Sequence, residues 1–307
     1  MERKLPDNYI REIKIILSYI NKLELDLSGL TIVTEVGSGN YILSPLIPLL
    51  AGAKKVYAWT VNSQYGQAEE IIKNCRELVQ KLDLKERLIF HNGSINTNHL
   101  NEADIVTNSG FLRPLDYQKL QYLNSKCVIP LMYEKWELRE SDIDIEYCKK
   151  NNIKVAGTWE NHPDIEVFTG VGPLAIKLIL ESGLEVYQNN IFIWSDDHFG
   201  SEAKKAMINF GASKVLLSND SALFYSELEN LDTLYICDYD EKRNYFGDEG
   251  LIDLDKILKV NPSLNIVHLF GELSYDYLKN TTLNVYPKKN GKASLMTETL
   301  AYLGPSL

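Results

Sequence analysis

Acidic and histidine side chains occur together at one place in the sequence that could carry acid–base chemistry. Asp196, Asp197 and His198 directly follow the β-rich run 191–194 (IFIW). In an open α/β sheet, ligands bind outside the carboxyl ends of the strands, so these side chains stand where a substrate would meet them. His198 and Asp197 are candidate catalytic residues, because an imidazole beside a carboxylate can move a proton. The structural alternative is that an aspartate here caps the start of a helix.

A glycine turn nearer the N-terminus has the context of a ligand-binding loop. The run 35–40 (EVGSGN) closes the strand-like run 31–36 and precedes an apolar run with helical character at 42–51. Such a turn lets the backbone approach a nucleotide and directs helix N–H groups toward it. The alternative is a tight strand-to-helix turn with no ligand. The candidate cofactor-binding residues of this turn are Glu35, Gly37, Gly39 and Asn40.

This turn resembles the first motif of the Rossmann-like S-adenosylmethionine methyltransferases. The resemblance continues through the runs 51–58 (AGAKKVYA) and 84–93 (LKERLIFHNG) and covers residues 31–131. It implies S-adenosylmethionine as a cofactor of the first half. At the end of the second strand, Thr60 stands where that family has an acid for the ribose hydroxyls. Thr60 lacks the paired carboxylate oxygens that would accept both hydroxyl protons.

A second turn, 195–200 (SDDHFG), carries a different resemblance. It is preceded by the Asp-rich run 141–148 (SDIDIEYC) and the run 152–157 (NIKVAG), and it is followed by a helical stretch and the strand-like run 214–217 (KVLL). This order resembles the D-2-hydroxyacid dehydrogenases over most of the chain beyond residue 100. The resemblance implies two Rossmann-like domains, NAD(P) as the cofactor and a homodimer.

The second turn departs from the glycine pattern of that family. Ser195 and Asp197 stand at its first two glycine positions, and Gly200 is retained, which is the glycine needed for close helix–strand packing. The carboxylates of Asp196 and Asp197 would repel a pyrophosphate. Asp220, beyond the next strand, is a candidate for holding a ribose, with a turn residue as the alternative. The candidate cofactor-binding residues here are Ser195, Gly200 and Asp220.

The catalytic pair of the dehydrogenases is missing from its expected places. The family's carboxylate-binding arginine would follow the run 265–269, which continues as 270–273 (FGEL) without one. The family's histidine would fall in the run 286–289, where Lys288 stands. Hydride transfer by the family's own residues is therefore not expected, and whether the chain is an enzyme stays open.

Arg113 is a further candidate catalytic residue. It lies in the run 108–114 (NSGFLRP), which follows the strand-like run 105–107, and it is a natural anchor for an anionic group. The alternative is an arginine in a surface turn. The histidines form no HxH or HxxxH pair, so no metal site is predicted.

Strand-like and helical patterns alternate along the chain, with helical spacing at 67–82 and 164–186. Repeated strand–helix–strand units predict the α/β class with parallel sheets covered by helices on both faces. We expect two Rossmann-like doubly wound domains, residues 1–162 and 163–307, with an interdomain cleft. The boundary falls at 161–163 (NHP), because Pro163 disfavours helix at the residue before it.

Composition narrows the function classes. The 307 residues include 32 basic and 42 acidic side chains and carry a net charge of −10, which argues against nucleic acid as a partner. No apolar run approaches the roughly 18 residues of a membrane span, and the charged N-terminus is unlike a signal peptide. The 4 cysteines show no CxxC spacing and are expected to be reduced. A cytoplasmic location is the expectation.

Three hypotheses follow for the function. The leading one is a diverged nucleotide-binding, oxidoreductase-like enzyme that acts on a small-molecule substrate in the interdomain cleft, with NAD(P) or S-adenosylmethionine left open as the cofactor. The second is an S-adenosylmethionine-dependent methyltransferase or a related user of that cofactor. The third is a catalytically inactive Rossmann binding protein.

Overall fold

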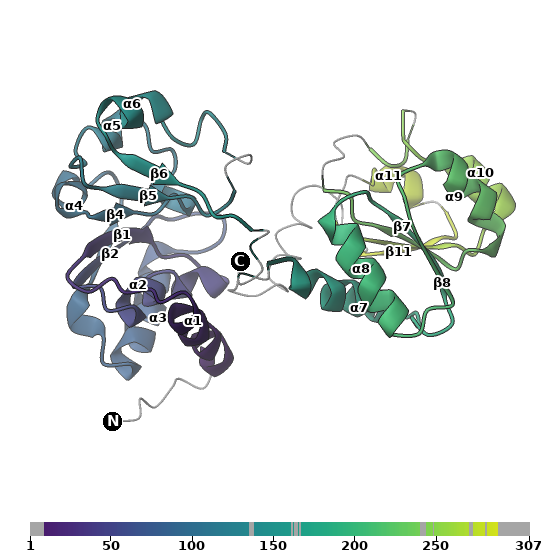
Figure 1. The fold of residues 1–307 in the computed structure, drawn as a ribbon, viewed down its shortest axis with the longest axis horizontal. Coiled ribbons are helices and arrows are strands. Elements are labelled where there is room, and N and C mark those ends of the chain that lie inside the picture. The colour runs from purple at the N-terminus through teal and green to yellow at the C-terminus, as the bar shows by residue number, and fades with distance from the viewer. Residues whose placement is uncertain are drawn as a thin grey trace. The chain divides into compact units, whose positions relative to one another are not determined.

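The computed structural model describes residues 9–134, 138–160, 162, 165, 167–239, 244–247, 249–269, 273–279 and 281–287. The described residues up to Ile165 form one compact unit, and those from Val167 onward form a second one. Each unit is an α/β domain with a parallel sheet, as predicted (Figure 1). The two units are described one at a time.

The first unit is built on a parallel sheet of six strands in the order β3-β2-β1-β4-β5-β6. The central strand is buried along its whole length, as expected when helices cover both faces of a parallel sheet. After β1 the chain adds β2 and β3 on one side of this strand, and it then returns to add β4, β5 and β6 on the other side. The neighbours β1 and β4 therefore form the topological switch point. The strands are β1 (Thr31–Glu35), β2 (Lys55–Thr60), β3 (Leu88–Asn92), β4 (Ile105–Val106), β5 (Val128–Pro130) and β6 (Lys154–Ala156).

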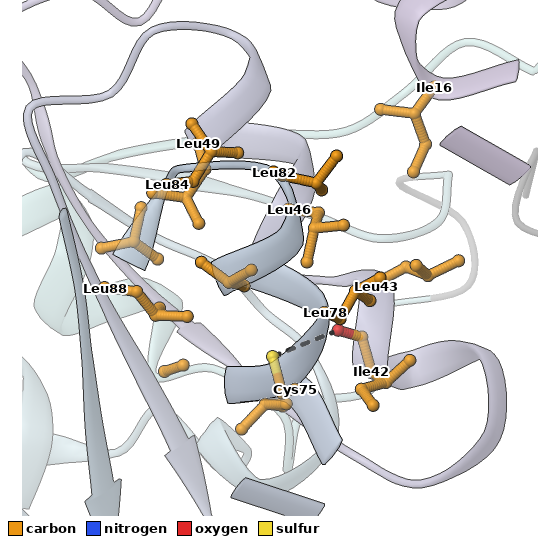
Figure 2. Packing of buried hydrophobic residues seen from close by; sticks show 14 of the residues in the cluster. Ile16, Ile42, Leu43, Leu46, Leu49, Cys75, Leu78, Leu82, Leu84 and Leu88 are labelled. Atoms are coloured by element: carbon orange, nitrogen blue, oxygen red, sulfur yellow. Dashed lines mark hydrogen bonds between the residues drawn. The ribbon is translucent and has the colours of Figure 1, made fainter. Parts of the chain in front are cut away.

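Helices cover both faces of this sheet (Figure 1). One face packs against α1, α2 and α3 through aliphatic side chains, and the other packs against α4, α5 and α6. Figure 2 shows the first of these cores, where the Cys75 thiol donates to the Ile42 carbonyl at 3.6 Å. The helices are α1 (Ile10–Lys22), η2 (Gly39–Leu43), α2 (Leu46–Leu50), α3 (Ala68–Lys81), η3 (Lys85–Arg87), α4 (Thr97–Glu102), η4 (Gly110–Leu112), α5 (Tyr117–Leu120) and α6 (Ile145–Lys150).

The helical run predicted at 42–51 is divided in the structure. A short 3₁₀ helix, η2, follows the glycine turn, and α2 begins only after Pro45. Pro45 has no backbone N–H to donate, so the hydrogen bonds of η2 cannot continue through it into α2. The helix predicted at 67–82 is confirmed as α3.

The second unit carries a parallel sheet of five strands in the order β11-β10-β9-β7-β8. Here the neighbours β7 and β9 form the switch point. The strands are β7 (Asn190–Trp194), β8 (Lys214–Leu217), β9 (Thr233–Ile236), β10 (Asn265–His268) and β11 (Asn284–Tyr286).

Helices α7 and α8 pack on one face of the second sheet, and α9, α10 and α11 pack on the other. The predicted helix 164–186 is shorter in the structure, because α7 ends at Glu181 and Gly183 takes the left-handed conformation that terminates helices. The helices are η6 (Val167–Gly170), α7 (Val171–Glu181), α8 (His198–Asn209), α9 (Ser221–Glu227), η7 (Leu228–Asn230), α10 (Leu254–Val260) and α11 (Tyr275–Leu278). None of the helices in the described ranges is long and apolar enough to cross a membrane.

Candidate functional site

The carboxyl ends of β1 and β4 bring two predicted segments together in the first unit. The glycine turn 37–39 leaves β1, and the run 108–113 leaves β4. A backbone N–H joins them, because Phe111 donates to the Glu35 carboxylate at 3.3 Å. Crevices for ligands in open α/β sheets form at such a switch point.

Glu35 is buried between these segments, with only 3% of its surface exposed. Burial raises the pKa of its carboxyl, while the Phe111 N–H, the Arg113 charge and the Ser109 hydroxyl act in the opposite direction. Gly110 lies directly against the carboxylate, where a side chain would not fit. Glu35, predicted to bind a cofactor, thus contacts the loop that follows β4.

The two glycines of the first turn differ in their surroundings, since Gly37 is packed and Gly39 is exposed. Gly37 is buried, and a Cβ there would lie 2.8 Å from the Cβ of Tyr41. Gly39 has φ +58 and no atom within 4 Å of the position that a Cβ would take. Asn40 beside it is exposed. The backbone at Gly39 therefore borders free space, as a ligand-contacting turn requires.

The loop after β4 leads to a polar network around Arg113. Its Nη1 lies 3.7 Å from Oδ2 of Asp142, and its guanidinium carbon lies 6.0 Å from the ring centre of Tyr133. The Tyr133 hydroxyl donates to Asp142 at 2.5 Å and accepts from Asn108 Nδ2 at 2.9 Å. The sequence indicated Arg113 and the run that holds Asn108, but not the contacts with Tyr133 and Asp142, which come from other segments of the chain.

Thr60 ends β2, where the methyltransferase resemblance places an acid. It is fully buried. Its hydroxyl has no hydrogen-bond partner in the described part of the chain.

The second loop is filled by one of its own side chains. The Asp197 carboxylate accepts from the Ser195 hydroxyl at 2.7 Å, from the Gly200 N–H at 3.1 Å and from the Tyr239 N–H at 2.9 Å. It caps α8 and so occupies the Gly200 N–H, one of the helix N–H groups that would face a pyrophosphate. Gly200 packs tightly, because a Cβ there would lie 2.6 Å from both Leu217 Cδ1 and Ser195 Oγ.

The remaining predicted residues of the second unit, His198 and Asp220, make local contacts. His198 is exposed and stacks on Phe168, with ring centres 5.3 Å apart. No hydrogen bond between the described His198 and Asp197 side chains pairs the two for proton transfer. Asp220 caps α9 by accepting from the Ala222 N–H at 2.8 Å.

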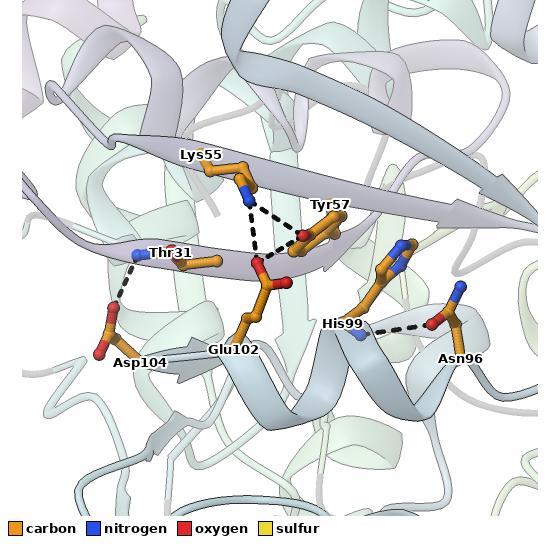
Figure 3. A network of polar contacts seen from close by, with 7 residues as sticks. All are labelled: Thr31, Lys55, Tyr57, Asn96, His99, Glu102 and Asp104. Carbon is orange, nitrogen blue, oxygen red and sulfur yellow. Dashed lines mark hydrogen bonds and ion pairs between the residues drawn. The ribbon is translucent and has the colours of Figure 1, made fainter.

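A second polar cluster of the first unit was not predicted (Figure 3). The Tyr57 hydroxyl donates to Glu102 at 2.6 Å, and Lys55 Nζ donates to both groups, at 2.9 Å to Glu102 and 3.2 Å to Tyr57. The His99 ring stacks on Tyr57 with centres 3.8 Å apart. Burial and the charge of His91 lower the pKa of His99. The alternation of Lys55 and Tyr57 along β2 is the sequence signal for this cluster.

A metal centre is not apparent within the described ranges, where no three His, Cys, Asp or Glu side chains are grouped for one. Burial raises the pKa of the Cys75 and Cys127 thiols to about 12 and that of Cys148 to about 11, so these groups are protonated at neutral pH. These cysteines therefore belong to the core.

Comparison with known proteins gives a likeness of fold. No family model matches the chain, and no curated protein matches it. One chain of dipicolinate synthase from Bacillus subtilis is 10% identical, with 91% of this chain and 94% of that chain covered and a TM-score of 0.52. The corresponding dipicolinate synthase chain from Bacillus halodurans is 11% identical, with 90% and 95% covered and a TM-score of 0.54.

A third similar structure is D-mandelate dehydrogenase from Rhodotorula graminis, which is 10% identical, with 89% of this chain and 92% of that chain covered and a TM-score of 0.37. The predicted architecture of two Rossmann-like domains is confirmed by the two parallel sheets and by the similarity in fold to the dipicolinate synthase chains.

Proposed function

We propose that this chain is a nucleotide-dependent, oxidoreductase-like enzyme that acts on a small metabolite, and that its nucleotide lies against the glycine turn of the first unit. The observation that carries this proposal is the contrast between the two loops. Gly39 borders free space in the first loop, whereas in the second loop the Asp197 carboxylate accepts from Ser195, Gly200 and Tyr239.

The residues of the first unit suit a bound nucleoside. The positive φ of Gly39 and the absence of atoms beside it leave the backbone accessible at the end of β1. Glu35 holds the loop after β4 in place through the Phe111 N–H, so the ends of β1 and β4 are joined without a ligand. NAD(P), when bound, would supply hydride transfer.

S-Adenosylmethionine is the second candidate, and the helix after the glycine turn favours it. That helix, η2, is a 3₁₀ helix of 5 residues, so it has a much weaker dipole than the long α-helix that stabilises a pyrophosphate. S-Adenosylmethionine has no phosphate and does not need that dipole.

Calorimetric titration with NAD(H), NADP(H) and S-adenosylhomocysteine tests the proposal. We expect one of these three cofactors to bind the unmodified chain, and we expect Gly39→Val to weaken its affinity at least roughly ten-fold, because the new side chain fills the free space. Gly29→Val is the matched control, since Gly29 also has a positive φ of +82 and free space but lies before β1. The proposal fails if none of these cofactors binds the unmodified chain, or if Gly39→Val binds the cofactor with the affinity of the unmodified chain.

A further inference from the structure

We propose that Arg113 anchors a subsite for a small, singly charged carboxylate at the carboxyl end of β4. Taking this carboxylate to belong to the enzyme's substrate rests on the proposed function. The subsite itself rests on contacts within the first unit.

The first argument is that the Arg113 guanidinium has donors without acceptors. Its side chain is only 30% exposed, and the nearest oxygen of Asp142 lies 3.7 Å away, beyond hydrogen-bond distance. Within the described part of the chain, it donates no hydrogen bond to any residue. A guanidinium carries five N–H donors, and leaving them unsatisfied in a partly buried place is costly. An anionic ligand would satisfy them.

The second argument is that a polar network holds Arg113 in place. Asp142 lies beside the guanidinium and accepts from Tyr133, which in turn accepts from Asn108. Asn108 is fully buried, and its Oδ1 has no partner among the described residues. The network therefore orients the cation.

The third argument concerns the charge of the ligand. Arg113 lies 3.7 Å from Asp142, and its charge also acts on the Glu35 carboxyl. A phosphate group, with a charge near −2, would meet two acidic side chains with one cation to balance them. A carboxylate carries one negative charge and matches the two parallel N–H bonds of a guanidinium. The site therefore favours a carboxylate over a phosphate.

The fourth argument is location. The Glu35 carboxylate contacts Gly110 and Phe111, which directly precede Arg113 on the loop after β4. The same Glu35 ends β1, from which the glycine turn departs. A carboxylate at Arg113 would thus lie at the same switch point as the proposed nucleotide, as a substrate must.

Thermal unfolding of the full chain with added ligand tests this subsite. The probes are sodium acetate and sodium lactate, with inorganic phosphate as the second anion and sodium chloride at equal ionic strength as the reference. No nucleotide is present. We expect Tm to rise and saturate with either carboxylate, since a ligand that binds only the folded state stabilises it. Phosphate stabilises folded proteins non-specifically because it is excluded from their surface, so its effect on Tm is expected to be the same in the unmodified chain and in Arg113→Gln.

Arginine variants then locate the effect. Arg113→Gln is expected to abolish the carboxylate-dependent rise in Tm, and Arg113→Lys to weaken the affinity by about ten-fold because it loses the planar fork. Arg139→Gln is the matched control, because Arg139 is an exposed arginine of the same unit and carries the same charge change. It is expected to bind as the unmodified chain does.

The proposal is overturned if no carboxylate raises Tm, if the phosphate effect on Tm is lost in Arg113→Gln, or if Arg113→Gln responds to the carboxylates like the unmodified chain. Should Arg113→Gln fail to fold, as judged by circular dichroism, Arg113→Lys and Tyr133→Phe carry the test, with weakened affinity expected for both. The Gly39→Val variant separates the two proposals. It should lose affinity for the nucleotide and keep the rise in Tm with acetate or lactate. If the unmodified chain responds to the carboxylates but binds none of the tested cofactors, only the proposed function is rejected.

Discussion

The carboxylate of Glu35 occupies the space that a side chain at Gly110 would need. A Cβ built on Gly110 would lie 1.6 Å from Glu35 Oε2, which is far inside any permitted contact. Glu35 ends β1 and Gly110 opens the short helix after β4, so this pair joins the two sides of the switch point. With the Glu35 carboxylate buried at this place, position 110 has room only for glycine.

Replacing Gly110 by alanine should destabilise the first unit. The added methyl group must displace a buried carboxylate, and overpacking of this kind costs about 1–3 kcal/mol. Urea unfolding followed by circular dichroism measures the change. Gly29→Ala is the control, because Gly29 also has a positive φ but no atom within 4 Å of the new Cβ. If Gly110→Ala is as stable as Gly29→Ala, the Glu35 carboxylate does not exclude a side chain at position 110.

Removing the Asp197 carboxylate should destabilise the second unit more than removing another helix cap. Asp197 accepts three hydrogen bonds, from Ser195, Gly200 and Tyr239, so Asp197→Ala is expected to cost about 2–3 kcal/mol. Asp220 caps α9 by accepting from the Ala222 N–H, and Asp220→Ala is expected to cost about 1 kcal/mol or less. Equal losses in the free energy of unfolding for Asp197→Ala and Asp220→Ala would contradict the view that the three hydrogen bonds of Asp197 hold the second loop.

The stability of the second unit should fall in acid because of His268. This imidazole is buried, and burial lowers its pKa from 6.5 to about 3. Above pH 6.5 it is neutral in both states; below that pH the unfolded chain takes up a proton that the folded chain does not, so stability decreases until the pH reaches about 3. The accumulated loss from this group at pH 4 is about 3 kcal/mol.

Unfolding free energies measured between pH 7 and pH 4 test this pH dependence. His268→Gln should flatten the slope, whatever its stability at pH 7, because it removes the titrating group. His198→Gln, which changes an exposed histidine of the same unit, should leave the slope as it is. An unchanged slope in His268→Gln would assign the acid sensitivity to other groups.

The thiols should be unreactive in the folded protein. Cys75, Cys127, Cys148 and Cys237 are all buried, and burial raises the pKa of each, so little thiolate forms at pH 8. An aromatic disulfide reagent should react slowly with the native chain and with all 4 cysteines after unfolding in urea. Rapid reaction of a single thiol in the native protein would indicate local opening around that cysteine.

The strand-and-helix alternation and both turns were predictable because they depend on local patterns. Helical spacing over 67–82 corresponds to α3, and the runs around Gly37 and Gly200 both follow strands. Pro45 is also a local signal, yet its effect on the 42–51 run was missed, since the apolar character of that run dominated the prediction. In the same way Gly183 ended α7 earlier than apolar spacing indicated.

The sequence by itself determined that this chain forms parallel α/β sheets with a turn at the end of each first strand, because hydrophobic periodicity and glycine conformation act over a few residues. Only the tertiary structure decided which turn is open. The strand order brings Tyr239 to Asp197 and closes the second loop, and it brings Glu35 to Gly110 while leaving Gly39 and the Arg113 donors unfilled. Whether a polar group has a hydrogen-bond partner depends on residues from distant strands. The spacing of residues along one segment does not reveal those partners.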